Sequence, residues 1–365
     1  MKIVTILGTR PEIIRLSLII PRLDRLCDHR LVHTGQNFDP RLSDIFFSEL
    51  GVRSPDHRLG IESSSFGRQA GLILERVETL LAQERPDRLL VLGDTNSALS
   101  AIVAKRMGIP VFHMEAGNRC HDDRVPEEVN RRLIDQVSDV LMPYTERSRR
   151  NLAREGVPEE RIYVTGNPIF EVLQHFEPAI AASTALDRMD LSPGKFLLAT
   201  LHRAENTDEP VRLARLMEGL ERIAATTGFP VILSAHPRLR SRLEGGGIAP
   251  GAGIRPCEPF GFFDFVALEK AAHCVLTDSG TVQEECAILG LRNVTLRDTT
   301  ERPETLESGS NILAGSEPGD MLRAVQAALD GPVDGSAPAE YRRPNVSQTV
   351  TRIVTGYLRP SWGRA

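Results

Sequence analysis

Short apolar runs alternate with helical patterns along the chain, and this alternation is the feature that most restricts how it can fold. Continuous apolar character marks the runs KIVTILG, RLLVLGD and PVFHMEA. A strand that is apolar on both faces must be covered on both faces, which is typical of a parallel sheet with helical crossovers. The sequence therefore predicts an α/β fold of doubly wound parallel sheets.

A second β-α series begins after residue 167, with the runs KFLLATL, PVILSA and HCVLTDS. Because 365 residues are comfortable for two α/β domains, we expect Rossmann-like domains at 1–167 and 168–346. Two such domains facing a central cleft would bring the carboxyl ends of both sheets around one ligand site. A last helix, expected within 347–365, follows a loop long enough to reach either domain.

Composition narrows the class of protein. The formal net charge is −5, so there is no global basic field for a nucleic-acid backbone, and any anion site must be local. The five cysteines are odd in number and lack Cys-x-x-Cys spacing, which favours reduced thiols. Because Arg10, Glu12 and Arg15 interrupt the apolar N-terminus, it resembles neither a signal peptide nor a membrane span. We expect a cytoplasmic protein without nucleic-acid or membrane partners.

Polar residues gather directly after the expected strands. The segments are GTRPE, TGQNFD (which contains Gln36), GDTNS, EAGNR, HRAEN and DSGTVQEE. One polar residue after a strand is usually a turn or a helix cap, but six such segments in register are better explained by a ligand site.

The segment GTRPE lacks the further glycines of a dinucleotide-binding loop, and no Walker lysine loop occurs, so neither a nicotinamide cofactor nor a P-loop is supported. Pro11 fits a first helical turn, where free backbone N–H groups together with Arg10 and Arg15 could hold an anion. A helix cap with surface charge explains the same residues equally well.

The segment TDSGTVQEE favours a nucleotide site. Ser279 and Gly280 lie at an expected strand-to-helix turn, where small residues let a phosphate approach backbone donors. Glu284 and Glu285 are expected in the first turn of that helix, either to compensate its dipole or to supply a carboxylate that accepts two ribose hydroxyls. Arg302 is a second candidate for binding the phosphates.

Acidic residues at strand ends are candidate proton acceptors and donors. Asp94 and Glu115 end apolar strands and are expected to be buried, where carboxyl pKa values tend to rise.

The run RVPEEVNRR places Glu127 and Arg131 on one helical face and Glu128 and Arg132 on another. Surface ion pairs would contribute little, so we expect the face of Glu127 to turn inward. The pair of Glu128 and Arg132 is expected to be solvated only.

The expected strands also indicate where three histidines lie. His113 lies inside a strand, as a core histidine would, whereas His202 and His236 end strands in the second half. No spacing of histidines and acids matches a zinc helix, so direct acid-base use is favoured over a metal site.

Taken together, the motifs GTRPE, HTGQNFD, GDTNS, HMEAGNR, PEEVNR, HRAEN, HPR, DSGTVQEE and RDTTERPE closely resemble the non-hydrolysing UDP-N-acetylglucosamine 2-epimerases, from the first strand to about Glu304. The resemblance implies a GT-B fold of two Rossmann-like halves with a UDP-sugar in the cleft. It also implies a C-terminal helix that crosses back to the first domain, a homodimer, and no metal or redox cofactor.

The resemblance also implies roles for particular residues. The implied catalytic group is Asp94, Glu115, Glu127, Arg131 and His202. The implied UDP-sugar-binding group is Arg10, Arg15, Gln36, His202, His236, Ser279, Gly280, Glu285 and Arg302. Many relatives have lysine where this chain has Arg15.

The implied reaction interconverts UDP-GlcNAc and UDP-ManNAc by anti elimination of UDP to a 2-acetamidoglucal and re-addition. Four alternatives stay open. EAGNRCHDDRVPEE and TGQNFD resemble the branch that epimerises modified UDP-sugars, of the diacetamido-uronic acid or N-acetyl-fucosamine type. The others are a hydrolysing epimerase that releases UDP and ManNAc, a GT-B glycosyltransferase, and a nucleotide-sugar-binding regulator.

Overall fold

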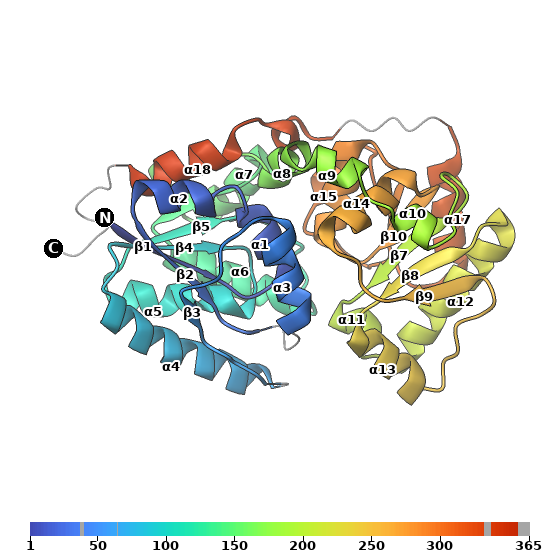
Figure 1. The fold of residues 1–365 in the computed structure, drawn as a ribbon, viewed down its shortest axis with the longest axis horizontal. Coiled ribbons are helices and arrows are strands. Elements are labelled where there is room, and N and C mark those ends of the chain that lie inside the picture. Colours follow the sequence, from blue (N-terminus) through green and yellow to red (C-terminus); the bar gives the residue numbers. More distant parts are fainter. Residues whose placement is uncertain (37–39, 64, 332–336, 357–365) are drawn as a thin grey trace. The chain divides into compact units, whose positions relative to one another are not determined.

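The computed structural model describes residues 1–36, 40–63, 65–331 and 337–356, and it divides into two compact units (Figure 1). Unit 1 comprises Met1–Gln174 together with the chain from Glu340 onwards, and unit 2 comprises His175–Ala339. The division falls later than the expected boundary at 167, because α8 (Pro168–His175) belongs with unit 1. Its Glu171 carboxylate accepts hydrogen bonds of 2.7 Å from the backbone N and Oγ of Ser347, at the start of α18 (Val346–Thr355).

Unit 1 is built on a six-stranded parallel sheet in the order β3-β2-β1-β4-β5-β6. The chain enters at the centre, moves to one edge and returns to the other side, so the strand order reverses between β1 and β4, as in a Rossmann fold. The strands are β1 (Lys2–Leu7), β2 (Asp28–His33), β3 (His57–Arg58), β4 (Arg88–Leu92), β5 (Val111–Met114) and β6 (Val140–Met142). The further helices of this unit are α1 (Arg10–Leu16), α2 (Ile20–Leu26), α3 (Pro40–Glu49), α4 (Phe66–Glu84), η1 (Asn96–Leu99), α5 (Ser100–Arg106), α6 (Pro126–Val137), α7 (Glu146–Arg154), η2 (Glu159–Arg161) and η3 (Ala339–Arg342).

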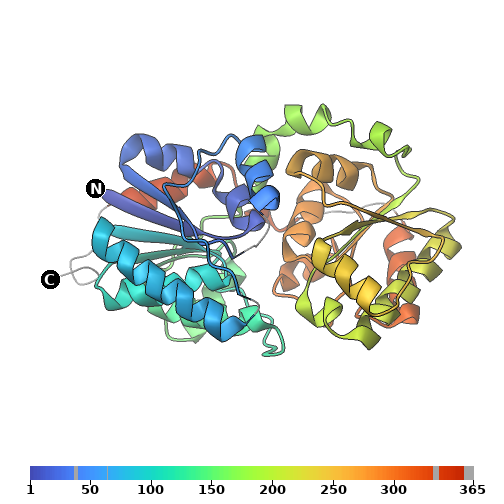
Figure 2. The same ribbon diagram turned by 60° about the horizontal axis from the view of Figure 1, so that its bottom comes forward.

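Unit 2 repeats this plan with a six-stranded parallel sheet in the order β12-β11-β10-β7-β8-β9, which reverses between β7 and β10. Its strands are β7 (Leu197–Leu201), β8 (Val231–Ala235), β9 (Ile254–Cys257), β10 (Cys274–Thr277), β11 (Asn293–Thr295) and β12 (Ile312–Leu313). Its helices are α9 (Glu177–Ala181), α10 (Ala185–Arg188), α11 (Ala204–Thr207), α12 (Pro210–Thr227), α13 (Pro237–Gly245), α14 (Phe262–Ala271), α15 (Gly280–Leu289), α16 (Pro303–Glu307) and α17 (Pro318–Leu329). Helices cover both faces of each sheet (Figure 2).

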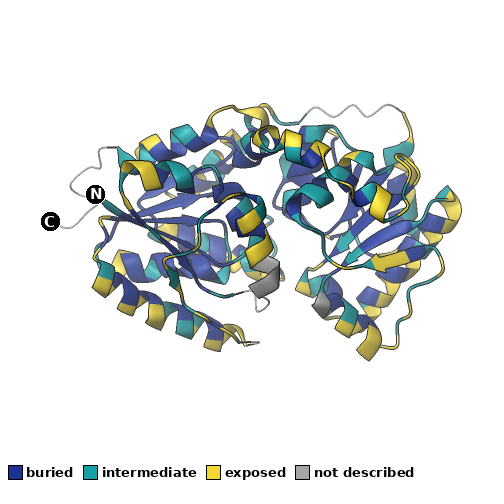
Figure 3. Ribbon diagram, viewed as in Figure 1, coloured by how far each residue is buried: buried dark blue, intermediate teal, exposed yellow. Residues whose placement is uncertain are grey.

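The central strands form the core of each unit, as their continuous apolar runs predict. All five residues of β4 are buried, and so are all four of β10. The covering helices turn buried faces to the sheets and exposed faces outward (Figure 3). The two sheets therefore confirm the predicted pair of Rossmann-like, doubly wound parallel domains. None of the described helices is long and apolar enough to cross a membrane.

The C-terminal helix is shorter than expected in the described part of the chain. It spans Val346–Thr355 in α18, and residues 357–365 of the expected helix lie outside the described residues. It packs against α2 of unit 1, and the guanidinium of Arg88 donates to the carbonyl of Val354.

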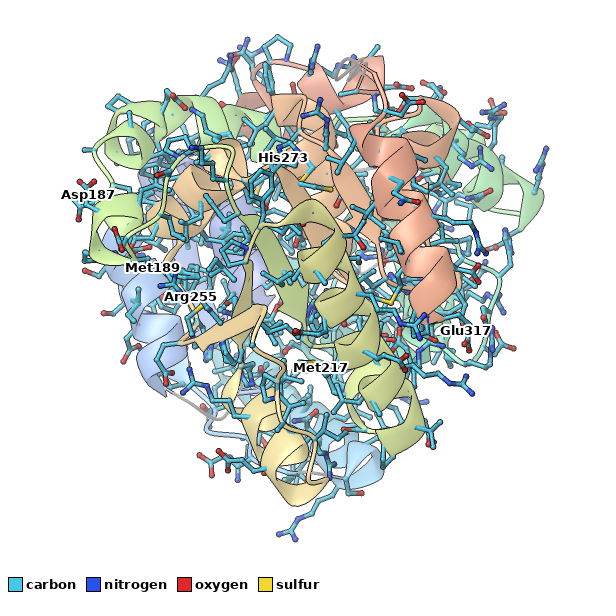
Figure 4. The ribbon with its side chains drawn as sticks, turned by 90° about the vertical axis from the view of Figure 1, so that its right-hand side faces the viewer. Asp187, Met189, Met217, Arg255, His273 and Glu317 are labelled. Atoms are coloured by element: carbon cyan, nitrogen blue, oxygen red, sulfur yellow. The ribbon has the colours of Figure 1, made fainter. Side chains whose placement is uncertain are left out.

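The amino ends of the unit 2 strands carry a surface cavity of about 370 Å³. Its lining includes Phe229 and His273, which directly precede β8 and β10 and whose rings meet edge to face with their centroids 5.0 Å apart. His273 is labelled in Figure 4. The polar motifs lie at the opposite, carboxyl ends of these strands, so this cavity is separate from the candidate site.

Candidate active site

The loop after β1 is held by hydrogen bonds to Glu12, an acid on α1, the helix that follows the loop. The Glu12 carboxylate, on α1, accepts hydrogen bonds from the backbone N of Gly8 at 3.0 Å and of Thr9 at 2.8 Å. It also accepts from Thr95 Oγ1 at 3.2 Å, which ties the β1 loop to the β4 loop. Burial raises the pKa of Glu12 to about 7, against the hydrogen bonds that favour its ionised form. The backbone N–H groups of Gly8 and Thr9 are therefore taken by Glu12, which forms a capping box with Thr9, as the helix-cap alternative predicts.

Arg10 opens α1, with Pro11 in the first turn as predicted. Its guanidinium lies 5.7 Å from the centre of the Phe46 ring, and burial lowers its pKa.

The loops after β1, β2 and β4 meet tightly around Gly8. A Cβ atom at Gly8 would lie 2.1 Å from Ser97 Oγ and 2.3 Å from Thr34 Oγ1. Gln36 joins the same contact, because its Oε1 accepts from the backbone N of Ser97 at 3.0 Å and from its Oγ at 2.9 Å. Asn37, Phe38 and Asp39 of the TGQNFD motif lie outside the described residues.

Glu115 follows β5 with a left-handed backbone, at φ +64°, which is uncommon for a residue other than glycine. Its side chain is buried, as predicted, and Arg15 Nη1 donates to Oε2 at 2.6 Å. The Tyr144 hydroxyl lies 3.4 Å from the same oxygen. Arg15, which we expected to help hold an anion, is itself buried in the ion pair that orients Glu115.

Asp94 is oriented by Arg131 from α6. Arg131 Nε donates to Asp94 Oδ2 at 3.0 Å, and Nη2 donates to the same oxygen. The Asp94 side chain is 22% exposed, so it is less buried than predicted and reachable by a ligand. Asn130, beside Arg131 on α6, donates to the backbone carbonyl of Asp94 at 3.0 Å. Glu127 lies half-buried in the first turn of the same helix.

The prediction that Glu128 is only solvated is wrong. Its carboxylate is fully buried and accepts from the backbone N of Cys120 at 3.0 Å and of His121 at 3.1 Å. Burial opposes ionisation, but the Cys120 hydrogen bond and the charge of Arg131 outweigh it and lower the pKa of Glu128 to about 2. Glu128 thus anchors the segment that follows β5. Arg132 is 40% exposed and pairs with Glu128 at 3.0 Å.

His113 is a core histidine, as predicted. Its Nε2 lies 2.9 Å from the carbonyl oxygen of Gly93, and its Nδ1 lies 2.9 Å from Asp135 Oδ1. Asp135 also pairs with Arg119 at 2.8 Å. This buried chain fixes the backbone next to Asp94, so His113 supports the site without facing it.

In unit 2, His202 follows β7 and is oriented by Asp278, which follows β10. The two side chains pair at 2.8 Å through Nδ1, while the His202 side chain stays 43% exposed. Asp278 also accepts from the backbone N of His202 and of Arg203 and from Asn206 Nδ2. Burial opposes its ionisation, but the charge of His202 and these hydrogen bonds lower the pKa of Asp278 to about 2. Asp278 was not among the predicted site residues, although it opens the DSGTVQEE motif.

The turn after β10 has the small residues that a phosphate site requires. Ser279 is the N-cap residue of α15, and its Oγ lies 2.7 Å from Thr281 Oγ1 instead of accepting from a backbone N–H of the helix. A Cβ atom at Gly280 would lie 2.7 Å from Glu301 Oε1 and 2.8 Å from the guanidinium carbon of Arg302. Arg302 is therefore packed directly against this turn.

The prediction that Glu284 and Glu285 lie in the first turn of α15 is wrong, because the helix begins at Gly280 and its first turn holds no acid. Both side chains are buried one turn later, so they do not compensate the helix dipole from solvent. Glu284 accepts from Arg302 Nε at 2.8 Å, and Arg302 also pairs with Glu301.

His236 is half-buried directly after β8, and the neighbouring side chains of Pro237 and Arg238 lie outside the described residues. Within the described residues, no three His, Cys, Asp or Glu side chains gather as they would around a metal ion.

Asp94, His202 and Asp278 follow strands that border the switch point of their sheet, which is where open α/β sheets bind ligands. Glu115 follows the next strand, β5, and Glu127 begins the helix after it. Unit 1 holds Asp94 with Arg131, Glu115 with Arg15, and Glu127. Unit 2 holds His202 with Asp278 and the turn that starts α15.

Comparison with known proteins identifies the family of the chain. A family model described as UDP-N-acetylglucosamine 2-epimerase matches residues 22–355. A UDP-N-acetylglucosamine 2-epimerase of Methanocaldococcus jannaschii is 42% identical over 339 residues, covering 90% of this chain and 93% of the relative. A UDP-2,3-diacetamido-2,3-dideoxy-D-glucuronate 2-epimerase of Pseudomonas aeruginosa is 37% identical, covering 94% of this chain and 98% of the relative.

Solved structures agree with the sequence matches. The crystal structure of the Methanocaldococcus jannaschii UDP-GlcNAc 2-epimerase, in complex with UDP-GlcNAc and UDP, has a TM-score of 0.93 at 39% identity. The match covers 97% of this chain and 99% of that chain. The two Rossmann-like sheets and these matches together place the chain in the UDP-N-acetylglucosamine 2-epimerase family, with its GT-B fold.

Proposed function

We propose that the protein interconverts UDP-GlcNAc and UDP-ManNAc by eliminating UDP to a 2-acetamidoglucal and adding it back. The observation that carries the proposal is the pairing of Asp94 with Arg131 and of Glu115 with Arg15 at the carboxyl ends of β4 and β5. The names of the relatives, at up to 42% identity over most of the chain, support the same substrate.

The reaction needs a base and an acid at C2 of the sugar. When the C1–O bond to UDP breaks, the leaving diphosphate takes that electron pair, and the electron pair of the C2–H bond forms the C1=C2 double bond. A carboxylate accepts the C2 proton, and a carboxyl on the opposite face returns one before UDP adds back to C1. Asp94, Glu115 and Glu127 supply these groups, and the two arginines hold the first two carboxylates in fixed orientations.

The leaving diphosphate needs positive or N–H partners where its charge develops. His202 suits this role because Asp278 fixes its ring through Nδ1 while its side chain stays exposed. The first N–H groups of α15, at Gly280 and Thr281, supply a second partner at the positive end of a helix of ten residues, whereas the N–H of Ser279 already donates to Thr277 Oγ1 at 3.0 Å. Arg10, Arg302, His236, Gln36 and Glu285 complete the proposed binding group.

Incubation with UDP-GlcNAc in D2O tests the reaction directly. We expect the manno epimer with deuterium at C2, seen by NMR. Asp94→Asn and Glu127→Gln should keep UDP affinity within a few-fold while turnover and C2 exchange fall by a factor on the order of 10² to 10⁴. A fully active variant would remove that residue from the mechanism.

The same experiment separates the other activities. Free ManNAc with UDP would identify a hydrolysing enzyme, and turnover only in the presence of a sugar acceptor would identify a glycosyltransferase. Tight UDP-GlcNAc binding without C2 exchange would identify a regulator.

A modified UDP-sugar is a second candidate substrate, favoured by the 37% identity to the diacetamido-glucuronate epimerase. Measuring kcat/KM for that UDP-sugar and for UDP-GlcNAc on one preparation decides between them. A higher value for the modified sugar would make it the preferred substrate.

We also propose a cytoplasmic homodimer, as the family resemblance implies. Light scattering after gel filtration should give twice the chain mass of 40.3 kDa. Cell fractionation should recover the protein with the cytoplasm, and a single-chain mass or a membrane fraction would contradict these two statements.

A further inference from the structure

One buried carboxylate in unit 2 contacts three arginines. Glu301 lies just before α16 and is 2% exposed. Its Oε2 accepts from Arg297 Nη1 at 2.8 Å. Its Oε1 accepts from Arg203 Nη2 at 3.2 Å and also from Arg302 Nη1. The mechanism proposed above makes use of Arg302 but not of Glu301.

The three arginines come from loops on both sides of the turn that starts α15. Arg203 follows β7, directly after His202, whereas Arg297 and Arg302 follow β11. The sheet order places β10, which ends in that turn, between β7 and β11 (Figure 1). Glu301 therefore joins the two loops that flank the turn, next to the point where the strand order of unit 2 reverses.

The carboxylate also packs against the turn itself. A Cβ atom at Gly280 would lie 2.7 Å from Glu301 Oε1 and 2.8 Å from Arg302 Nη1. The oxygen that two arginines share is thus next to the residue whose backbone N–H opens α15. A carboxylate alone would repel a phosphate at this place, so its use in an anion site lies in the guanidinium groups that it binds.

Buried guanidinium groups need fixed anionic partners, because burial takes away the water that would otherwise solvate and screen them. Arg297 is 1% exposed and Arg302 is 3% exposed. Glu284 accepts from Arg302 Nε at 2.8 Å, and Glu205 Oε1 lies 3.6 Å from Arg297 Nε. Glu301 contacts all three arginines, so it sets their positions relative to one another.

We propose that Glu301 is a positioning residue for the diphosphate of UDP. It holds Arg302, together with the segment of His202 and Arg203, around the turn before the nucleotide binds. This inference rests on the proposed function. Donors that are fixed in advance stabilise a charge without being reordered by it, so the effect of Glu301 falls on the phosphates and not on the uridine. Glu301 itself does not contact the nucleotide.

A substitution that removes only the charge tests this role. Glu301→Gln keeps the size of the side chain, but its amide nitrogen cannot accept from an arginine. The control is Glu218→Gln on α12, which also takes a carboxylate from an arginine, at a side chain that is 51% exposed. The readout is the ratio of the Kd values of uridine and UDP for the full chain, from NMR titration of uridine and calorimetry of UDP.

We expect wild type and Glu218→Gln to prefer UDP over uridine by the same factor. Glu301→Gln should lower this preference by roughly ten- to a hundredfold, the range of one charge-assisted hydrogen bond, and leave the Kd of uridine unchanged. A side chain that only stabilised the domain would weaken both ligands together when replaced. An unchanged preference, tighter binding of UDP, or a parallel loss for both ligands would overturn the proposal.

A second variant decides the question even where Glu301→Gln does not fold. Glu301→Asp keeps the charge that the buried arginines require, but its carboxylate is one methylene shorter and cannot keep all three contacts. We expect it to fold and to prefer UDP less than wild type does, again with an unchanged Kd for uridine. A preference equal to that of wild type would show that the placement of this carboxylate does not matter for the diphosphate.

Failure of the proposed function would look different from these results. Wild-type protein that binds no UDP, or that binds UDP without any C2 exchange, would count against the epimerase. Wild-type protein that epimerises UDP-GlcNAc, with Glu301 variants that keep its preference for UDP, would count against the role of Glu301 alone.

Discussion

The ion pairs that orient the candidate acids join residues that are far apart in the sequence. Arg15 and Glu115 are 100 residues apart, and Arg131 and Asp94 are 37 apart. Both arginines are buried, so removing either would take the ion-pair partner from a carboxylate of the proposed reaction centre. The carboxylates are therefore fixed by the tertiary fold rather than by their own strands.

At Gly8, the close approach of three loops leaves no room for a side chain. We expect Gly8→Ala to lower the free energy of unfolding by about 1–3 kcal/mol, because its Cβ would overlap Ser97 Oγ and Thr34 Oγ1. Turnover should also fall, since Ser97 lies on the loop that carries Asp94. Urea unfolding and the epimerase assay measure the two effects.

The control for this substitution is Gly71→Ala on the exposed face of α4, where an added Cβ meets nothing within 4 Å. That change should stabilise the protein by about 0.5–1 kcal/mol, because alanine loses less backbone entropy in a helix. Equal stability of both variants would contradict the crowding around Gly8.

At the scale of elements, α1 and the β4 loop are joined by the single carboxylate of Glu12. Folding raises its pKa from an ordinary 4.5 to about 7. The folded state therefore holds a proton that the unfolded state releases between these pH values. Glu12 contributes stability below pH 4.5, and this contribution is lost as the pH rises through about 7.

The pH dependence of Glu12→Gln tests this linkage. Relative to wild type, the variant should gain up to about 3 kcal/mol in free energy of unfolding between pH 4.5 and 7.5, as a shift of this size implies. Urea unfolding at several pH values measures the difference. Glu78→Gln, an exposed substitution on α4, should follow the wild-type profile. A constant difference between Glu12→Gln and wild type would contradict the raised pKa.

Sequence periodicity predicts helices and strands well, because the spacing of apolar residues in each element reflects which of its faces are buried. The buried strands β4 and β10 could be read as continuous apolar runs, and the polar motifs at their ends located both candidate sites. The predictions for Glu128 and for the first turn of α15 failed for a different reason. Spacing shows which side chains share a helical face, but it does not show what that face meets, nor at which residue the helix begins.

The roles of the remaining residues of the candidate site depend on partner side chains that come from other elements. Asp278 could have been noticed, because an acid directly after a buried strand has the same signature as Asp94 and Glu115. The role of Arg15 depended on Glu115, which no local pattern connects with it.

At the scale of the molecule, each unit has its own sheet and its own buried core. The core of unit 2 comes from one continuous stretch, whereas unit 1 takes segments from both ends of the chain. A domain with its own core can fold alone.

We therefore expect the fragment His175–Ala339 to unfold cooperatively in urea and to bind UDP more weakly than the full chain. It should show no C2 exchange, because Asp94, Glu115 and Glu127 belong to unit 1. Circular dichroism and calorimetry measure both properties, with the fragment carrying Gly280→Ala as the control for specific UDP binding. A fragment without a cooperative transition would show that unit 2 depends on unit 1.

Because α18 packs on unit 1, unit 1 can be completed only after the end of the chain has been synthesised. The ribosome releases the strands of unit 1 first, then all of unit 2, and only afterwards the helix whose first turn binds Glu171 and whose last turn receives Arg88. Until that helix emerges, the earliest part of the nascent chain keeps an uncovered surface near α2. The half of the enzyme that is translated first is thus the half that is finished last, and premature termination after unit 2 would leave it exposed to proteases and chaperones.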